Sequence, residues 1–551
     1  MGKVVLASIA HILTVGIVIG AVVVVKEGNE IAMDSLCADA YHPHLCRETL
    51  TPVANGDAKV VSPKASVEAA LNATIKAVKL AIIDSKSLEK EVKDDFDAIS
   101  LESCKRYIKM SAEDLEIVIS MVSKSEMNVM DGFARESNIF LSAVLTYTST
   151  CVGEMNNPKM KETLQGEVLL NTTRLAENGL AIVEGVAQFL DNVNISELSG
   201  KKSDRRLLDI EEDGYPTWLS VSDRKLLQVN GKRLSPDVTV SKNGDAEYKT
   251  ITEALKAYRR PKHKEKFVIY IMKGVYEEYV NVTQSNVFMY GDGPNQTIIT
   301  GNKNKKIMNI DTGRTPTFAA YGDGFMAKHM GFHNTAGSAG HQAIALLTNF
   351  RQAAFYDCSF DGYQDTLCYQ THKSFFRQCV ISGTIDFIFG QGVALIQNSQ
   401  IIVKMPTSTE FNKNVIFADG RMYKRQNTGL VIQNCTIQAV PELLASKVMK
   451  TYLGRPWGPY ARTFIVNSEI PGFICPEGYD IWNAKDPHDT TADFREYANR
   501  GEHSDISARV KWPGVGVPTK RMLNQFRPAR WIKAQVWLPQ TGIPFDLEFI
   551  H

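Results

Sequence analysis

Short apolar strands recur along the second half of the chain in one repeating pattern. In each segment an apolar strand is followed by a polar, Asn-like residue, a small Cys or Ser, and then a β-branched or aromatic residue. The Cys or Ser positions are 21, 20, 36 and 33 residues apart. A constant strand core with loops of variable length is typical of a solenoid. The repeating segments are residues 354–360, 375–381, 395–401, 431–437 and 464–470.

The strand-rich repeat, punctuated by glycines, favours a parallel β-helix over a stack of helical repeats. We therefore predict that residues 236–551 form a right-handed parallel β-helix, in which successive turns stack about 4.8 Å apart. Each residue then lies directly above its equivalent in the turn before. An ordinary β-sandwich would leave the common spacing unexplained.

The first half of the chain has apolar residues at helical spacing instead. Ser62 followed by Pro63 marks a helix start, because proline is favoured at the first helical position. The apolar runs 71–82, 115–122, 140–147 and 180–190 predict four amphipathic helices. Four helices of this length suit an up-and-down four-helix bundle, so residues 34–195 are predicted to form an all-α domain.

An apolar segment of 22 residues, 4–25, lies between Lys3 and Lys26. It is long enough to span a bilayer. It lacks the shorter apolar core and small-residue cleavage site of a removable signal peptide. We interpret residues 1–33 as an uncleaved signal anchor whose C-terminal side is lumenal.

Residues 196–235 read as a charged linker between the two predicted domains. The linker contains two similar basic tetrads, which favour sites for a processing protease over a merely solvated run. The tetrads are Arg205-Arg206-Leu207-Leu208 and Arg224-Lys225-Leu226-Leu227.

Charge is divided unevenly between the two halves. Residues 1–227 carry 24 lysines and arginines against 33 aspartates and glutamates, a net charge of −9. Residues 228–551 carry 38 and 28, a net charge of +10. A basic second half suits a polyanionic partner, and an acidic first half could dock against it. Charge alone does not distinguish nucleic acid from an acidic polysaccharide.

Nine cysteines and six glycosylation sequons agree with a secretory route. The chain has no CxxC pair, no HExxH motif and no Cys/His cluster with zinc spacing, so neither a metal nor a cofactor is predicted. The candidate glycosylation sites are Asn72, Asn171, Asn194, Asn281, Asn295 and Asn434.

Three cysteine pairs are candidates for disulfides. Cys37 and Cys46 are close in sequence, and a bond between Cys104 and Cys151 would staple two helices. The sequence does not settle the connectivity. Cys358 and Cys379 lie one turn apart, which fits disulfide geometry, and whether they pair is open.

The 21-residue offset also relates two acidic residues. Asp365 and Asp386 are 21 residues apart, and Gln342 lies 22 residues before Gln364. In a stacked coil the two carboxylates become neighbours with two amide side chains beside them. Because two adjacent carboxylates do not easily both ionise, one can act as an acid while the other acts as a nucleophile. This arrangement predicts an acyl-transfer site with the two amides stabilising the oxyanion.

Six motifs in the second half resemble those of plant pectin methylesterases that carry an N-terminal inhibitor-like pro-region. The resemblance covers nearly all of residues 236–551 and extends more weakly over 34–195, through four cysteines and the run 140–147. The motifs are GVYEE at 274–278, GFHNTAG at 331–337, HQAIAL at 341–346, GYQDTL at 362–367, DFIFG at 386–390 and LGRPW at 453–457.

The resemblance implies roles for individual residues. Asp386 corresponds to the nucleophile, Asp365 to the proton donor and acceptor, and Gln364 and Gln342 to the groups that stabilise the transition state, Gln342 also touching substrate. Arg455 corresponds to the residue that holds the nucleophile, which fits a bidentate pair. The further substrate-binding positions implied are Thr312 and Trp457, the latter offering a flat face to a sugar ring.

The implied reaction is hydrolysis of galacturonate methyl esters in homogalacturonan to carboxylates and methanol, without a cofactor. The implied partners are pectin, a protease at the basic tetrads and a proteinaceous inhibitor, but no nucleic acid. The implied location is the cell wall, after secretion and processing. The helical domain is expected to inhibit or chaperone the β-helix until the linker is cut.

The chain departs from the family pattern at several positions around the predicted site. These departures concern rate and substrate preference rather than reaction type. They are Ser399 for Cys, Cys368 for an aromatic residue, Gln391 for Asn, Leu347 for Arg, His329 for Asp, and Gly501-Glu502-His503 for Gly-Pro-Gly.

Two other functions compete with esterase activity. A glycoside hydrolase also uses two carboxylates, about 5–9.5 Å apart, but the pair of glutamines has little use at an acetal. A non-catalytic wall-binding module is the third hypothesis, and the departures keep it open.

Overall fold

The computed structural model describes residues 30–56, 59–125, 130–193, 235–259, 266–408 and 411–549. Within these ranges no helix is both long and apolar enough to cross a membrane. The apolar segment 4–25, both basic tetrads and Asn194 lie outside the described residues.

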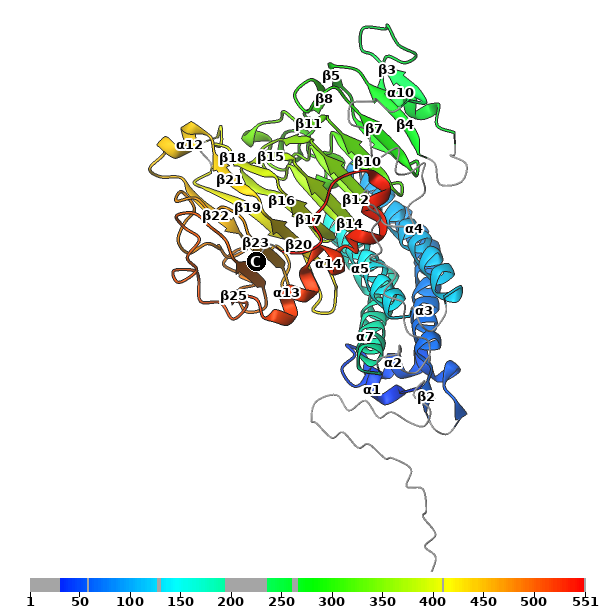
Figure 1. Cartoon of the computed structure of the whole chain (residues 1–551). Helices are drawn as coiled ribbons and strands as arrows, with labels where there is room; N and C mark the ends of the chain where they lie inside the picture. The colour runs from blue at the N-terminus through cyan, green and yellow to red at the C-terminus, as the bar shows by residue number, and fades with distance from the viewer. Residues whose placement is uncertain are drawn as a thin grey trace, which may run out of the picture.

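A bundle of four long helices forms the first unit, as predicted, and it stands beside the β-rich unit (Figure 1). Ser62 caps the first helix by accepting a hydrogen bond from the Ala65 backbone, and Pro63 is its first residue. The predicted apolar stripes are buried, among them Leu71, Leu115 and Val144. The long helices are α3 (Pro63–Asp84), α4 (Asp95–Ser123), α5 (Met130–Glu154) and α7 (Leu170–Val193).

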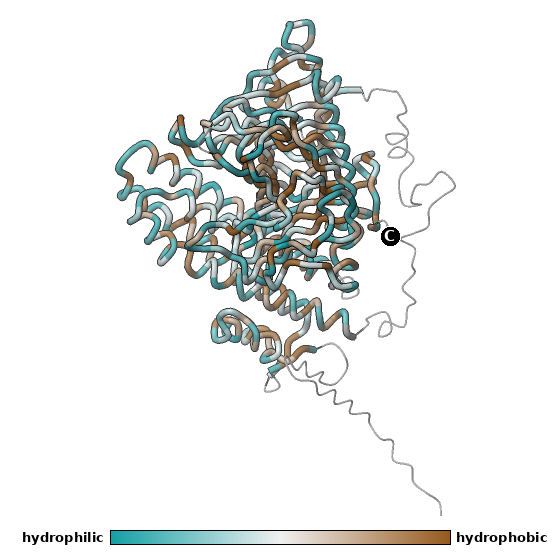
Figure 2. Tube along the Cα trace, turned by 90° about the vertical axis from the view of Figure 1, so that its left-hand side faces the viewer, coloured by the Kyte–Doolittle hydropathy of each residue, from teal (hydrophilic) through white to brown (hydrophobic). Residues whose placement is uncertain are grey.

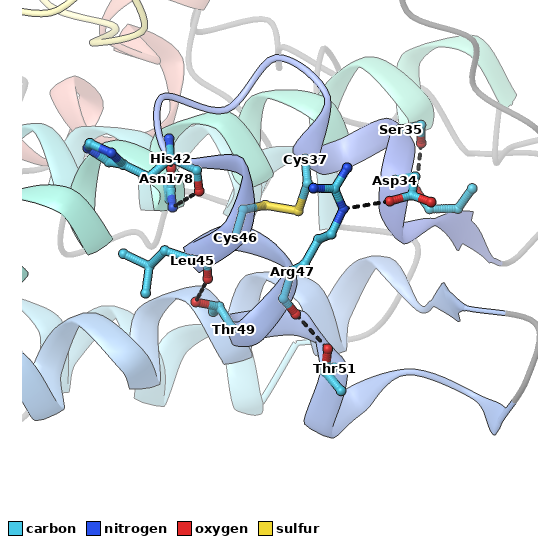
Figure 3. Close-up of a disulfide and its surroundings, with 11 residues drawn as sticks. Asp34, Ser35, Cys37, His42, Leu45, Cys46, Arg47, Thr49, Thr51 and Asn178 are labelled. Carbon is cyan, nitrogen blue, oxygen red and sulfur yellow. Dashed lines mark hydrogen bonds and ion pairs between the residues drawn. A yellow bond between two sulfur atoms is a disulfide. The ribbon is translucent and has the colours of Figure 1, made fainter.

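Shorter elements close the bundle at one end. Ile31 and Ala32 pair with Val61 and Val60, so ordered structure takes in residues before the predicted boundary at 34. The Cys37–Cys46 disulfide joins the first two short helices, and Arg47 pairs with Asp34 across it (Figure 3). These elements are β1 (Ile31–Ala32), α1 (Met33–Cys37), α2 (Pro43–Leu50), η1 (Thr51–Val53), β2 (Val60–Val61), η3 (Ser85–Glu91), α6 (Pro158–Thr163) and η5 (Leu164–Val168).

The second unit is the predicted parallel β-helix, and its strand pairs within the described ranges are all parallel. Its first face contains β3 (Val238–Val240), β4 (Phe267–Ile271), β7 (Val287–Tyr290), β10 (Phe325–Lys328), the C-terminal halves of β12 (Leu346–Tyr356) and β14 (Leu367–Arg377), β17 (Val393–Gln397), β20 (Gly429–Gln433), β23 (Arg462–Val466), β24 (Asp493–Tyr497) and β25 (Val515–Gly516).

The second face is a separate seven-stranded sheet. It consists of β5 (Gly274–Glu277), β8 (Thr297–Gly301), β11 (Gly331–Asn334), β13 (Ser359–Asp361), β15 (Val380–Gly383), β18 (Gln400–Val403) and β21 (Thr436–Ala439).

The third face, called the site face below, is joined to the first through the long strands β12 and β14. It contains β6 (Val280–Val282), β9 (Phe318–Ala320), the N-terminal halves of β12 and β14, β16 (Ile385–Gly390), β19 (Lys413–Asp419) and β22 (Lys450–Gly454).

The repeat read from the sequence is a repeat of backbone conformation. All five Asn-like positions have a left-handed φ between 49° and 53°. Such a residue turns the chain from the first face to the second, and the following Cys or Ser points into the coil. Asn and Asp tolerate this conformation better than most residues because their short polar side chains bond locally. The positions are Asp357, Gln378, Asn398, Asn434 and Asn467.

Stacked apolar side chains fill the coil, and Figure 2 shows hydrophobic stretches through its middle with polar turns at its edge. The C-terminal segment covers the first face, where Trp531 and Trp537 belong to the same buried apolar cluster as Phe375 and Leu395. This segment contains α13 (Lys520–Phe526), α14 (Pro528–Trp531) and α15 (Ala534–Trp537), followed by η9 (Leu538–Thr541). Four further short elements lie in loops: α10 (Ile251–Lys256), α11 (Lys305–Met308), η7 (Thr312–Arg314) and α12 (Pro441–Ala445), with η8 (Ser338–Gly340) before β12.

The second expected disulfide, Cys104–Cys151, joins α4 to α5. Cys358 and Cys379 are both unpaired and buried in the coil, which answers the question left open by their spacing. Four of the sequon asparagines are exposed: Asn72, Asn171, Asn281 and Asn295. Asn434 is partly buried and its amide donates to Asn398 Oδ1, 3.0 Å away, so it is less suited to carry a glycan than these four.

Candidate active site

Asp365 and Asp386 stand on neighbouring turns of the site face. Leu367 of β14 is in register with Ile388 of β16, the same 21-residue offset that relates the two aspartates. The Asp365 backbone amide donates to the Ile385 carbonyl, 3.1 Å away. Both aspartates are buried and both have a left-handed φ, 64° and 50°. Backbone conformations of this kind are held in place only by surrounding structure, and they cluster at functional sites.

The two carboxyl groups differ in their surroundings. Arg455 donates from Nε to Asp386 Oδ1 at 2.8 Å and from Nη2 to Asp386 Oδ2 at 2.5 Å, a bidentate pair. Burial and the charge of Asp386 raise the pKa of Asp365 well above its ordinary value. One carboxyl is therefore bound by a guanidinium, while burial and a neighbouring carboxylate favour the protonated form of the other.

All seven residues that the sequence singled out for the reaction line one cavity of about 560 Å³. The amide oxygen of Gln364 has no hydrogen-bond partner among the described residues, so this buried amide has capacity for a ligand. The seven residues are Thr312, Gln342, Gln364, Asp365, Asp386, Arg455 and Trp457.

Trp482 is a site residue that the sequence did not indicate. The Arg455 guanidinium lies 4.4 Å from the centre of the Trp482 ring and donates from Nη1 to its carbonyl at 3.5 Å. Burial alone would lower the pKa of Arg455, but the charge of Asp386 more than offsets this and the net direction is upward. Trp482 belongs to a loop outside the strand repeat, so no spacing could have identified it.

The C-terminal end of α5 forms a roof over this cavity. Ser149, Thr150, Gly153 and Glu154 all line it. Glu154 Oε1 accepts a hydrogen bond from the Gly313 backbone amide, 3.2 Å away and next to Thr312. Burial, together with the nearby Asp311, raises the pKa of Glu154 to about 7. A carboxyl group of the helical unit thus occupies the cleft that holds the two aspartates.

Pairs of acidic and basic side chains join the helical unit to the β-helix. Asp114 Oδ2 lies 2.7 Å from His372 Nε2, and Glu136 Oε2 lies 2.7 Å from Lys373 Nζ. Glu184 pairs with Arg425. In all three pairs the acid comes from the helical unit and the base from the β-helix, the polarity expected from the uneven charge of the two halves.

Hydrogen bonds from hydroxyl groups of the helical unit continue this contact toward the cleft. Tyr147 donates its hydroxyl proton to Asn349 Oδ1 at 2.9 Å, and Ser100 donates to Asp311 Oδ2 at the same distance. In the part of the chain that the structure describes, no group of three or more His, Cys, Asp or Glu side chains could hold a metal ion. The predicted independence from metal stays a prediction.

Comparison with known proteins identifies both units. A family model described as Pectinesterase matches residues 237–535, and one described as Plant invertase/pectin methylesterase inhibitor matches residues 32–182. Probable pectinesterase/pectinesterase inhibitor 21 of Arabidopsis thaliana is 37% identical over 523 residues, 93% of this chain and 76% of that protein. Pectinesterase/pectinesterase inhibitor U1 of Solanum lycopersicum is 34% identical over 579 residues, 99% of this chain and 96% of that one.

A solved structure, pectin methylesterase from carrot, is 38% identical with a TM-score of 0.55. The match covers 58% of this chain and 99% of that one. The carrot chain therefore corresponds to the β-helix without the helical unit.

Proposed function

The chain belongs to the pectinesterase family and carries an inhibitor-type helical domain, and from this premise we propose that its β-helix hydrolyses the methyl esters of homogalacturonan through Asp386 and Asp365. The bidentate pair between Arg455 and Asp386, beside the buried Asp365 whose pKa burial raises, is the observation that supports this most directly.

In the first step the Asp386 carboxylate attacks the ester carbonyl carbon. The negative charge moves to the carbonyl oxygen, where the Gln342 and Gln364 amides donate hydrogen bonds. One such donor is commonly worth about 2.7–4 kcal/mol. The tetrahedral intermediate collapses, its bond to the methoxy oxygen breaks, and Asp365 gives that oxygen its proton. Methanol leaves, and an anhydride joins Asp386 to the galacturonyl group.

In the second step Asp365, now a carboxylate, takes a proton from water as the water oxygen attacks the galacturonyl carbonyl. The anhydride bond breaks, Asp386 departs as a carboxylate, and the product is a galacturonic acid residue of the polymer with a free carboxyl group. Arg455 holds Asp386 in one orientation through both steps. Thr312 and Trp457 contact the polysaccharide.

The domain assignment that goes with this function is residues 34–195 as an inhibitor-like pro-domain, 196–235 as a processing linker and 236–551 as the esterase. While α5 covers the cleft, a polymer cannot reach Asp386, so the uncut chain is inhibited by its own pro-domain. The cavity lined by both units, the Glu154–Gly313 hydrogen bond and the three acid–base pairs support this role.

A secretory route completes the proposal. A signal anchor at 4–25 takes the precursor to the lumen, glycans are added at exposed sequons, a protease cuts after Leu208 or Leu227, and the esterase reaches the cell wall. A separate proteinaceous inhibitor can then use the face that the pro-domain leaves. The two disulfides of the helical domain agree with an oxidising compartment.

Methanol release from methyl-esterified pectin by the β-helix domain tests the function. Asp386→Asn should abolish release and leave the domain folded. Asp361→Asn, on the second face and paired with Lys404, is the matched control and should retain activity. Full activity of the folded Asp386→Asn variant would refute the assignment. Shortening of de-esterified chains would indicate a glycoside hydrolase, and pectin binding without turnover would indicate a wall-binding module.

A further inference from the structure

Asp419 is the last residue of the site-face strand β19 and is completely buried. Phe417, two residues earlier, belongs to the core of the coil, and Ala418 between them lines the cavity. Because successive residues of a strand point to opposite sides of a sheet, the Asp419 carboxyl group lies on the coil side, away from the catalytic aspartates. A carboxyl group is costly to bury, so the groups that bond to it show what it holds in place.

Three donors from separate segments of the chain converge on this carboxyl group. The hydroxyl of Tyr369, on β14, donates to Asp419 Oδ2 at 3.1 Å. Asp419 Oδ1 accepts from the backbone amide of Arg421 at 3.2 Å and from that of Arg462 at 2.8 Å. One side chain therefore joins β14, the residues that follow β19, and the first residue of β23.

The bond to Arg421 fixes the piece of backbone against which Trp457 lies. It runs from a side-chain oxygen to the amide two residues further on, which is an Asx turn around Gly420. A Cβ atom on Gly420 would lie 2.4 Å from Trp457 Cε3, so the indole ring sits directly on the backbone at this glycine. The shape of the Asx turn therefore sets the position of the ring.

The bond to Arg462 closes the loop that carries Trp457, residues 455–461 between β22 and β23. Backbone bonds hold the earlier part of this loop. The Arg455 amide donates to the Phe417 carbonyl at 2.9 Å, and the Gly458 amide donates to the Asp419 carbonyl at 3.1 Å. With its side chain bonded to Arg462 as well, Asp419 holds the loop at two points after Trp457.

We propose that Asp419 is a positioning residue for Trp457 and, through it, sets how tightly the polysaccharide binds; this rests on the proposed function. Without the carboxyl group, the Asx turn and the end of the loop lose their common anchor, and the indole loses its fixed place in the cavity. A displacement of about 1 Å is enough to weaken such a contact strongly. Arg455 depends less on Asp419, because two bonds to Asp386 and its own amide hold it.

The test measures kcat and KM separately for Asp419→Ala in the β-helix domain, with methyl-esterified homogalacturonan as substrate. That domain has a core without residues of the helical domain, and the carrot protein is a solved structure of the corresponding part alone. KM should rise on the order of tenfold, and kcat should change by less than about threefold. An unchanged KM in the folded variant, or a fall in kcat larger than the rise in KM, overturns the proposal.

A second substitution separates the positioning of Trp457 from general support of the fold. Trp457→Ala removes the indole ring and should itself raise KM. In that background Asp419→Ala should raise KM further by less than about twofold, because the group that it positions is gone. If the two effects multiply in the double variant, Asp419 does not act through Trp457 and the proposal fails.

Two variants serve as controls. Asp419→Asn keeps an acceptor oxygen for both backbone amides and should keep KM near that of the parent. Asp292→Ala removes a comparable carboxyl group outside the cavity, which accepts from the Tyr270 hydroxyl at 2.8 Å and from the Lys273 amide at 2.7 Å, and it should leave KM unchanged. A KM for Asp419→Asn as high as that of Asp419→Ala, or an equal rise in Asp292→Ala, overturns the proposal.

Tyr369→Phe covers the case in which Asp419→Ala does not fold. It removes one of the three donors and leaves the carboxyl group in place, so KM should rise in the parent background and not in the Trp457→Ala background. An unchanged KM in the parent background overturns the proposal. Absence of methanol release by the parent domain would instead refute the proposed function.

Discussion

The carboxyl group of Glu154 accepts a hydrogen bond from the backbone amide of Gly313, so a residue of the helical domain lies against the loop that carries Thr312 in the β-helix. The two residues are 159 positions apart in sequence. This single contact places the inhibitor-like domain in the cleft of its own enzyme.

Inhibition of the uncut chain should weaken as pH rises. The pKa of Glu154 is raised to about 7 in the docked state, and release returns it toward its ordinary value of 4.5. The docked state therefore binds more protons, and docking is strongest below about pH 4.5 and weakens as pH rises through about 7. Asp311, Arg106 and Arg314 face the same carboxyl, and burial raises the pKa of Asp311 as well.

The measurement is methanol release by the uncut chain divided by release by the β-helix domain, between pH 5 and 8. This ratio should rise by on the order of a hundredfold. Glu154→Gln should flatten much of the rise, since glutamine keeps an acceptor for Gly313 and does not titrate. If the Glu154→Gln variant kept the parent's pH dependence, Glu154 would not be the group that makes inhibition depend on pH.

Charge reversal at the domain contact should activate the uncut chain. Lys373→Glu places two buried carboxylates together, because the Lys373 side chain is 3% exposed and pairs with Glu136. Breaking a buried pair commonly costs about 3–5 kcal/mol. Adding Glu136→Lys should recover part of the inhibition. Recovery is incomplete because Lys533 also lies 3.6 Å from Glu136. If the uncut chain is equally active as the parent, the Lys373→Glu variant and the double variant, this pair does not hold the two domains together.

Substitution of Arg455 should lower kcat more than it raises KM. Arg455→Lys keeps the charge but loses the bidentate geometry that fixes both oxygens of Asp386. We expect kcat to fall at least about tenfold. Arg462→Lys, at a salt bridge with Asp493 outside the cavity, is the control. Equal kcat for the Arg455 variant and the parent would argue against the role of this pair.

Asp365→Asn should reduce turnover and change how stability depends on pH. Without a proton donor, methanol release should fall by about 10²–10⁴. The pKa of Asp365 is raised in the folded protein, so the fold disfavours the ionised form of this carboxyl. The parent therefore loses stability relative to the Asn variant as pH rises above about 4.

Thermal unfolding of the β-helix domain at several pH values measures this effect. The variant's advantage in free energy of unfolding should be smallest near pH 4 and should grow toward alkaline pH. A difference that does not vary with pH would mean that Asp365 is not held protonated.

Much of the β-helix could be predicted because its contacts are periodic in sequence. Around the site each turn pairs with the next at an offset of 21 residues, so the distance between Asp365 and Asp386 along the chain already predicted neighbouring carboxyls. The same offset relates Asp357 to Gln378, two turns with left-handed φ. Helical spacing likewise predicted the four long helices, since each buries one stripe of side chains.

The tertiary structure alone decided what covers the site and what lines it beyond the repeat. The approach of Glu154 to Gly313, the stacking of Arg455 on Trp482 and the pairing of Asp114 with His372 join segments that share no period. Such contacts depend on how the surfaces of separately folded segments fit each other. The net charges of −9 and +10 indicated that the halves attract, but only the packing of α5 against the site face determined that the attraction closes the cleft.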